Sequence, residues 1–183
     1  MYFLSLEDDL KMMARYIELT AENMKVYSIE CSRLILAACA EVDVVMKQVA
    51  DPSGECKVKN LGECRQIIEE RYPGLSSYTA SLPRYDLRFT PWASWPSNQP
   101  QWWKDYNDVK HHRDEFFARA NLENVINALA ALFVALLLYL RHKGIDIIMP
   151  ATVLFRPDPL LGAYCISPEG HLIDLRQQTP TST

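Results

Sequence analysis

A run of mostly apolar residues, VINALAALFVALLLYL at 125–140, constrains the fold more than any other stretch of this chain. A helix that crosses a membrane needs about 20 apolar residues, whereas this run has 16 and Asn127 interrupts it early. A helix that is apolar on most sides is otherwise buried in a protein core. We therefore expect a core helix that begins at Asn121, runs to Lys143 and ends at Gly144, and no membrane association.

The N-terminal stretch also predicts helix. From Ser5 to about Ala50 the sequence contains no proline and no glycine. Apolar residues recur there at helical spacing, at Leu6, Leu10, Met13 and Ile17. We expect the helix to start near Ser5, and the polar segment 20–23 leaves open whether the stretch forms one helix or two.

Two shorter helices are expected later in the chain. Asn60 with Glu63 can cap a helix that ends near 71–74, where a proline and a glycine follow. Another helix is predicted from about Gln101 to Phe117. Together these patterns predict an all-α fold, an up-and-down bundle of about four to five helices over residues 1–150.

The segment 73–100 contains five prolines, which no regular helix accommodates. Its aromatic residues favour a long ordered loop over a disordered one. All four tryptophans of the chain lie in or directly after it: Trp92, Trp95, Trp102 and Trp103. Such side chains can stack single-stranded bases, but the near-balanced charge around them favours burial of the loop against the bundle.

The chain changes character after Pro150. Short runs rich in strand formers, with Pro-Glu-Gly between the last two, predict a small β-hairpin extension at 151–176 and a flexible tail at 177–183.

The overall composition excludes few classes of function and identifies none. The 183 residues carry a net charge of −4, and the sequence pI is about 5.6, so nothing marks a general nucleic-acid binder, and no DNA binding is expected. The five cysteines lack the close spacing of a zinc site. We expect reduced thiols, no metal, no cofactor and a cytoplasmic protein, since the N-terminus shows no signal peptide.

The stretch YNDVKHHRDEFF at 106–117 contains the residues best suited to chemistry. On a helix Asn107 and His111 share one face, and Asp108 and His112 share the next. Histidine exchanges protons near neutral pH, and an amide can orient a phosphate or a water. The alternative interpretation is a solvated helix face with no chemical role.

Cations accompany these residues. Lys110 lies between the two faces, Arg113 follows, and Lys104 is the nearest cation upstream. Lysine and arginine can hold a phosphate and stabilise developing negative charge. The combination is typical of a site that cleaves a phosphodiester without metal.

Three pieces of the chain carry a resemblance to a known family: YSIECSRLILAACAEVD at 27–43, WWKDYNDVKHHR at 102–113 and NLENVINALAALFVALLLYL at 121–140. The chain resembles the HEPN-domain family (higher eukaryotes and prokaryotes nucleotide-binding) over roughly residues 5–143. The resemblance implies an all-helical bundle that dimerises, and a metal-independent RNase of a toxin–antitoxin, phage-defence or RNA-processing system.

The family's motif is an arginine, a polar residue, a short spacer and a histidine. By this resemblance His111 matches the histidine and Asn107 the polar residue, while Asp108 and His112 would support them. The arginine position holds Tyr106, which cannot supply a fixed cation with a bidentate fork. Lys104, Lys110 or Arg113 would then have to bind the phosphate.

Three functional hypotheses follow. The first is a HEPN-like RNase, or an RNase-derived protein that binds RNA or phosphate, acting as a homodimer. The alternative is a non-catalytic interaction protein with a degenerate site, which presents the Trp-rich loop or the hairpin to an antitoxin-like protein partner. The third is a domain that binds a free nucleotide at the same cationic face.

Overall fold

The computed structural model describes residues 2–54, 58–144, 147–148, 152–158, 164–166 and 172–174. Its described part is mainly helical, with short strands in two small sheets. The helices are α1 (Tyr2–Met13), α2 (Ile29–Ala50), α3 (Leu61–Arg71), α4 (Gln101–His111), α5 (Arg113–Phe116) and α6 (Leu122–His142). The strands are β1 (Ala80–Leu82), β2 (Leu87–Phe89), β3 (Ile147–Ile148), β4 (Arg156–Pro157), β5 (Tyr164–Ile166) and β6 (Leu172–Asp174).

Helix α6 is the centre of the core, as the apolar run predicts. Asn121 caps it by accepting a hydrogen bond from the Asn124 amide at 3.0 Å, and Gly144 follows its end with φ 69°. Among the described residues, α6 alone is long and apolar enough to cross a membrane, and 83% of its most apolar window is buried inside the protein. Such burial is what a core helix requires.

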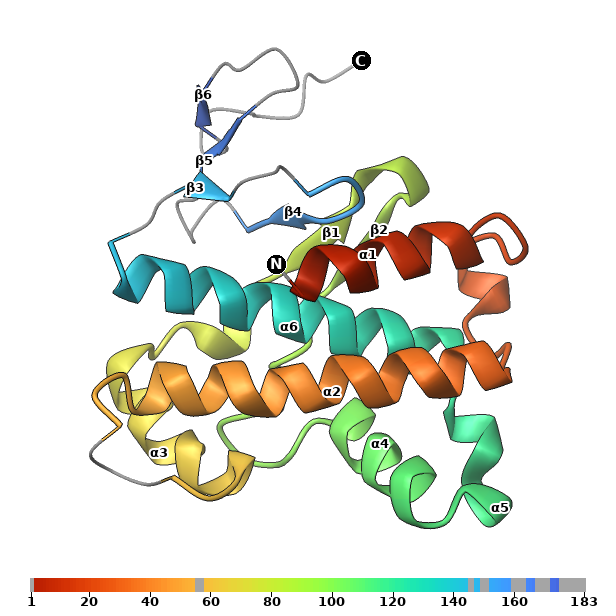
Figure 1. Cartoon of the computed structure of the whole chain (residues 1–183), viewed down its shortest axis with the longest axis horizontal. Coiled ribbons are helices and arrows are strands. Elements are labelled where there is room, and N and C mark those ends of the chain that lie inside the picture. The colour runs from red at the N-terminus through yellow and green to blue at the C-terminus, as the bar shows by residue number, and fades with distance from the viewer. Residues whose placement is uncertain are drawn as a thin grey trace.

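The N-terminal stretch forms two helices. Helix α1 starts at Tyr2, earlier than the expected start at Ser5, and a 3-10 turn at Ala21–Asn23 separates it from α2. The Ser28 hydroxyl caps α2 by accepting from the Cys31 amide at 3.0 Å. Helices α1 and α2 both pack against α6 (Figure 1).

The two longest helices, α2 and α6, run side by side in the same direction (Figure 1). Their starts are held together by a bridge between Tyr27 and Asn121 and by a hydrogen bond from the Leu122 amide to the Val26 carbonyl at 2.9 Å. Alternate helices of an up-and-down bundle run in the same direction, so this arrangement does not contradict the expected order. The segment from 51 to 121, which contains α3, α4 and α5, brings the chain back along the bundle before α6 begins.

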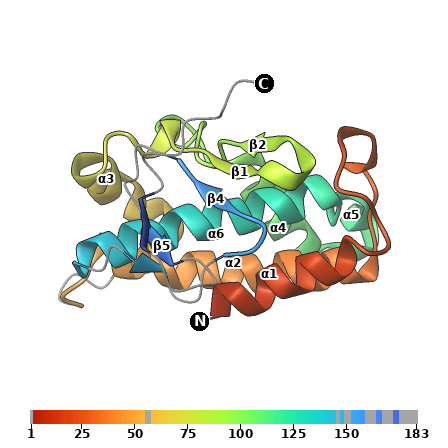
Figure 2. The same cartoon turned by 90° about the horizontal axis from the view of Figure 1, so that it is seen from above.

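Residues 80–89 form a hairpin rather than an unbroken loop. Strand β1 lies between β2 and β4, antiparallel to both, in a sheet that lies beside α6 (Figure 2). The expectation of an all-α fold with a 73–100 loop is corrected by this three-stranded sheet. The prolines permit it because Pro83 stands in the turn between β1 and β2, and Pro157 is on the edge strand β4.

The segment 152–158 is fixed to α1 by one buried carboxylate. Glu7 is 2% exposed and accepts hydrogen bonds from the backbone amides of Val153, Leu154 and Phe155 at 2.8–3.0 Å. Phe155 in turn packs against Phe3 and Phe133.

The antiparallel pairing of β5 with β6 confirms the predicted hairpin, and β5 also pairs in parallel with β3. The turn expected at 168–170 and the tail at 177–183 lie outside the described residues.

The tryptophans are buried, as the burial interpretation predicts. The Trp92 ring lies edge-on to the rings of Trp95 and Trp102, and its Nε1 donates to the Ala131 carbonyl of α6 at 3.3 Å. The indoles therefore fix the 91–103 segment to the core and form no exposed stacking surface.

Candidate functional site

Helix α4 holds the residues for which the sequence predicts chemistry. Trp102, Tyr106 and Val109 turn inward and are buried, so the opposite side faces solvent. The helix remains regular through His111, and positions three, four and seven apart lie on one face. Lys104, Asn107 and His111 therefore share one face of α4, as the sequence predicts for the last two.

The helix predicted from Gln101 to Phe117 is interrupted. His112 has φ −139° and ψ 48°, outside the helical region, and the short helix α5 starts after it. The His112 amide still donates to the Asp108 carbonyl at 2.8 Å, so these two residues keep the expected one-turn relation, and the helix ends there. The interruption turns the chain back, so that Arg119 reaches α4.

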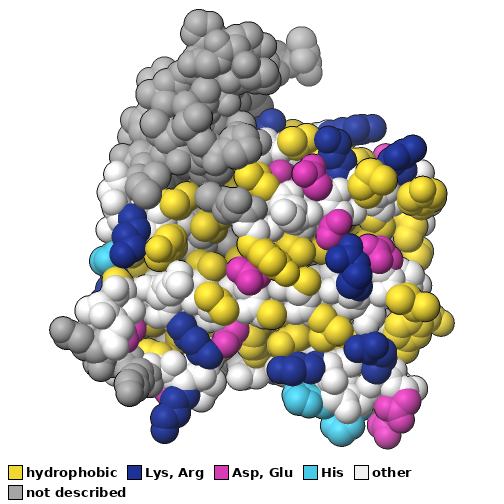
Figure 3. Space-filling model, in the orientation of Figure 1, with side chains coloured by type: hydrophobic (Ala, Val, Ile, Leu, Met, Phe, Trp, Pro, Cys, Tyr) yellow, Lys and Arg dark blue, Asp and Glu magenta, His cyan; other side chains and the backbone are white. Residues whose placement is uncertain are grey.

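Five of the predicted residues lie on the open surface. The exposed side chains are Lys104, Lys110, His111, His112 and Arg113, and the rings of the two histidines are 6.4 Å apart between centroids. Figure 3 shows histidine side chains beside Lys or Arg side chains at the lower edge of the molecule, over α4 and α5. We call Lys104, Asn107, Lys110, His111, His112 and Arg113 the α4 edge.

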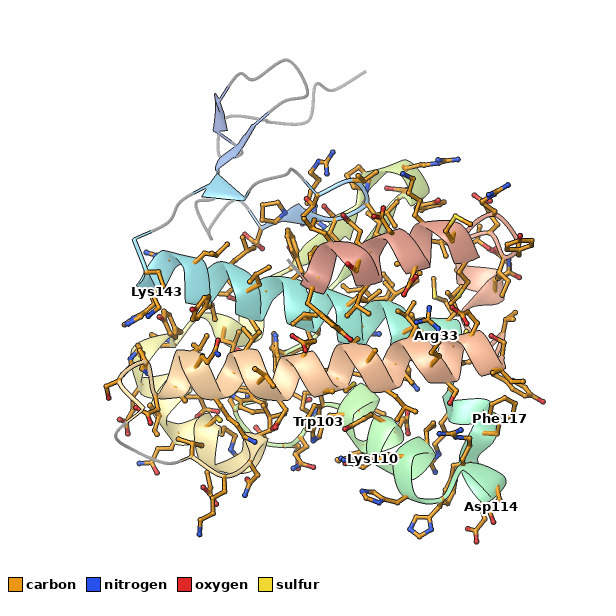
Figure 4. All side chains as sticks on the ribbon, viewed as in Figure 1. Arg33, Trp103, Lys110, Asp114, Phe117 and Lys143 are labelled. Atoms are coloured by element: carbon orange, nitrogen blue, oxygen red, sulfur yellow. The ribbon has the colours of Figure 1, made fainter. Side chains whose placement is uncertain are left out.

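The cations of the α4 edge are not neutralised by partners. Within the described part of the chain, no salt bridge involves Lys104, Lys110 or Arg113. The Lys110 ammonium lies 5.5 Å from the centroid of the Tyr106 ring, and Figure 4 shows Lys110 on α4 at the lower edge of the molecule. Their charge is therefore free to meet an anion from solvent.

Tyr106, at the position where the resemblance to HEPN domains would place an arginine, belongs to the core. It is 6% exposed and its ring packs against Trp103 at 5.0 Å between centroids. An arginine there would have to leave the core or bury its charge, which is costly without a partner.

The Asn107 amide is partly engaged by its own helix. Its Nδ2 donates to the Trp103 carbonyl at 2.9 Å, so one amide hydrogen and the Oδ1 oxygen remain for a ligand. This bond fixes the side chain along the helix axis.

The arginine that does reach α4 is Arg119, which sequence reasoning missed. Its guanidinium pairs with Asp108 and, at 3.2 Å, with Asp105, and it lies 4.3 Å from the centroid of the Phe116 ring. Asp108 thus holds Arg119 and does not support a histidine. No signal in the sequence separates Arg119 from other surface arginines, because the contact depends on the interruption at His112.

A polar cavity of about 330 Å³ lies at the other end of α4 and was also missed. It opens between the Thr90–Ser94 turn and the first turns of α4 and α6. The sequence does contain a signal for this cavity, because asparagine recurs every third residue at the start of an otherwise apolar helix, at Asn121, Asn124 and Asn127. The lining residues are Lys25, Thr90, Pro91, Ala93, Ser94, Pro100, Gln101, Trp102, Asp105, Asn121, Glu123, Asn124 and Asn127.

Neither the pKa shifts of the cysteine thiols nor the arrangement of metal-ligating side chains indicates another site in the described residues. Burial raises the pKa of the Cys39 thiol and raises that of Cys64 to about 11, which makes both thiols poor nucleophiles. Among the residues described, no three His, Cys, Asp or Glu side chains are grouped to hold a metal ion.

In comparisons with known proteins, no family model, curated protein or solved structure matches the chain.

Proposed function

We propose that this protein binds single-stranded RNA through its α4 edge, as a HEPN-like RNase or a protein derived from one. The observation that carries the proposal is the set of exposed cations without salt-bridge partners that surrounds His111 and Asn107 on α4 and at the start of α5. Phosphate contacts by lysine and arginine dominate affinity for nucleic acids. A local cluster can act in this way even though the whole chain is acidic.

Cleavage is the more demanding part of the proposal. His111 would take the proton of a ribose 2′-hydroxyl as its oxygen bonds to phosphorus. The bond from phosphorus to the 5′-oxygen then breaks, and His112 would deliver the proton that the leaving oxygen needs. This chemistry requires a 2′-hydroxyl, which agrees with RNA rather than DNA as the substrate.

The missing element is a fixed guanidinium. Arg119 is held by two carboxylates, and Arg113 lies beyond the interruption of the helix. A second copy of the chain in the proposed homodimer could contribute cations to the same phosphate. The geometry of one chain thus favours RNA binding over cleavage, and a role in toxin–antitoxin or phage-defence systems is part of the proposal.

Fluorescence anisotropy with a labelled single-stranded RNA tests the binding. Each phosphate contact changes the slope of log affinity against log salt by about −0.7 for single strands. Lys110→Ala should weaken binding and make the slope shallower by about 0.7. Lys143→Ala is the matched control, because Lys143 is exposed at the opposite end of the molecule (Figure 4). Equal effects of the two variants, or no RNA binding at low salt, would refute the proposal.

His111→Ala separates binding from cleavage. Because the side chain is exposed, we expect the variant to fold and to bind RNA. If the parent protein cuts RNA in the presence of a chelator and the variant does not, His111 acts in cleavage. A parent protein that binds RNA without cutting it is a binding protein with a degenerate site.

A non-catalytic interaction protein is the second candidate function, and exposed apolar residues favour it. Tyr16 and Ile29 are each 81% exposed, and Tyr27 is 52% exposed, at the end of the bundle where α2 begins. Large exposed apolar side chains in one region mark protein interfaces. Light scattering of the parent and of Ile29→Asp tests self-association, with a loss of mass expected in the variant if this surface joins two copies.

A further inference from the structure

The cavity at the start of α4 has the features of a small-molecule site that the α4 edge does not use. Its volume of about 330 Å³ lies within the usual range for such sites. Pro91, Ala93, Pro100 and Trp102 supply apolar surface on one side, and amide side chains line the other.

The amide side offers hydrogen-bond acceptors. Asn124 is 7% exposed, and its two amide hydrogens are donated to Asp105 Oδ2 at 3.0 Å and to the Arg119 carbonyl at 2.8 Å. Its Oδ1 oxygen has no partner among the described residues. Asn127 donates to the Glu123 carbonyl at 3.0 Å and likewise keeps its Oδ1 free. A ligand with N–H donors would satisfy both oxygens.

The charges around the cavity are already paired. The Lys25 ammonium contacts Glu123 at 2.5 Å, and Asp105 accepts from Arg119 and from Gln101 Nε2. Three lining residues are charged, one positive and two negative, and Arg119 pairs with Asp105 as well as with Asp108. Because both acids in the lining already have a cationic partner, the site suits a ligand without a negative charge.

The start of α4 offers donors. Pro100 occupies the cap position and supplies no side-chain hydrogen bond. Its carbonyl accepts from the Trp103 and Lys104 amides, which leaves the amides of Gln101 and Trp102 as the free donors of the first turn. A flat neutral molecule that donates to the asparagines and accepts from this turn matches the cavity.

We propose that the cavity receives an unpaired RNA base with an exocyclic amino group, adenine, cytosine or guanine in preference to uracil. The inference rests on the proposed RNA binding. Lys104 of the α4 edge precedes the cavity residue Asp105 on the same helix, so a strand held at Lys104 has its bases near the cavity. The two hydrogens of an amino group can be donated to both amide oxygens, whereas uracil has only the single N3–H to donate.

The test compares anisotropy of labelled oligo-A, oligo-C and oligo-U of equal length. We expect the first two to bind about 3- to 10-fold more tightly than oligo-U, as one added hydrogen bond allows. Asn127→Leu should remove this preference without changing the affinity for oligo-U. Asn98→Leu is the matched control, because Asn98 is exposed and does not line the cavity.

A second variant distinguishes a blocked cavity from a folding defect of Asn127→Leu. Ala93→Phe fills the cavity mouth from an exposed position and removes no side-chain hydrogen bond. If both variants keep the preference, or if the parent protein has none while binding all three oligomers, the cavity proposal is overturned and RNA binding stands. If no oligomer binds but adenosine shifts the amide resonances of Trp102 and Asn124, the proposed RNA binding is overturned and the cavity stands as a base site.

Discussion

The attachment of the 152–158 segment to α1 depends on Glu7. Removing the Glu7 carboxylate should therefore lower the stability of the protein measurably. The carboxylate is buried and accepts three backbone amides, two of them from the buried residues Leu154 and Phe155. The third, from Val153, belongs to a residue that is 53% exposed, so water can replace that partner.

Glu7→Ala leaves the two buried amides without an acceptor. A buried group that loses its partner costs about 1–3 kcal/mol, so we expect the free energy of unfolding to fall by about 3–5 kcal/mol once the lost packing is included. In a chain of this size each kcal/mol lowers the melting temperature by about 2–4 °C, and the variant should melt about 10 °C lower.

Glu7→Gln refines the prediction. The glutamine oxygen can still accept from Leu154 and Phe155, while its NH₂ group would face the Val153 amide, donor against donor. The expected loss is about 1–2 kcal/mol. Asp8→Asn is the matched control, because Asp8 is an exposed acid on the same helix and should change stability by less than about 0.5 kcal/mol.

Urea unfolding followed by circular dichroism measures these differences, and hydrogen exchange locates them. Exchange at the amides of Leu154 and Phe155 should accelerate in Glu7→Ala more than exchange in the middle of α6. If Glu7→Ala unfolds at the same urea concentration as Asp8→Asn, the carboxylate does not fix this segment and the reasoning is wrong.

Three further predictions concern the core and the thiols. Asn121→Ala removes the cap of α6 and should lower the free energy of unfolding by about 1 kcal/mol, read by urea titration. Phe155→Ala leaves a void beside two aromatic rings and should cost about 3–5 kcal/mol by the same assay. The Cys64 pKa of about 11 predicts alkylation that is slow at pH 8 and rises about tenfold per pH unit towards pH 11. Because this pKa is raised on folding, its contribution to stability is complete below the unfolded pKa of about 8.5 and is lost as the pH rises through 11.

Helix positions were predictable where caps and apolar spacing act locally. Asn60 and Glu63 cap α3 as expected: the Glu63 amide donates to Asn60 Oδ1 at 3.1 Å, and the Glu63 carboxylate accepts from the Lys59 amide, one residue before the cap, at 2.8 Å. Asn121 and Gly144 mark the limits of α6 for the same reason. These signals involve residues within one or two turns of each other.

The parts that sequence reasoning missed depend on contacts between distant segments. Strand β1 pairs with β4, more than seventy residues later, through Ala80 and Pro157, and strands of three and two residues are too short to show a period in the sequence. The same limit applies to the site. Asn107 and His111 share a face because they are one turn apart, whereas Arg119 reaches Asp108 only because the helix is interrupted.

The pairing of Arg119 with Asp108 leads to a last prediction about the α4 edge. Arg119 is the guanidinium that approaches α4, but two carboxylates occupy it. Asp108→Asn removes one of these carboxylates and leaves the side chain similar in size. We expect Arg119 to become available to a phosphate, so that RNA binds about 3- to 10-fold more tightly, as a hydrogen bond to a charged group allows.

Removing any acid near the α4 edge would also strengthen RNA binding by charge alone. The control must therefore remove one negative charge near the edge without affecting Arg119. Asp114 lies exposed on α5 beside the edge (Figure 4), and Asp114→Asn removes the same charge without releasing Arg119. Asp108→Asn should exceed it in affinity and steepen the salt slope by about a further 0.7. Adding Arg119→Ala to Asp108→Asn should abolish the excess. If the two single variants bind RNA equally, Arg119 is a structural residue of the α4 and α6 contact and contributes nothing to the phosphate.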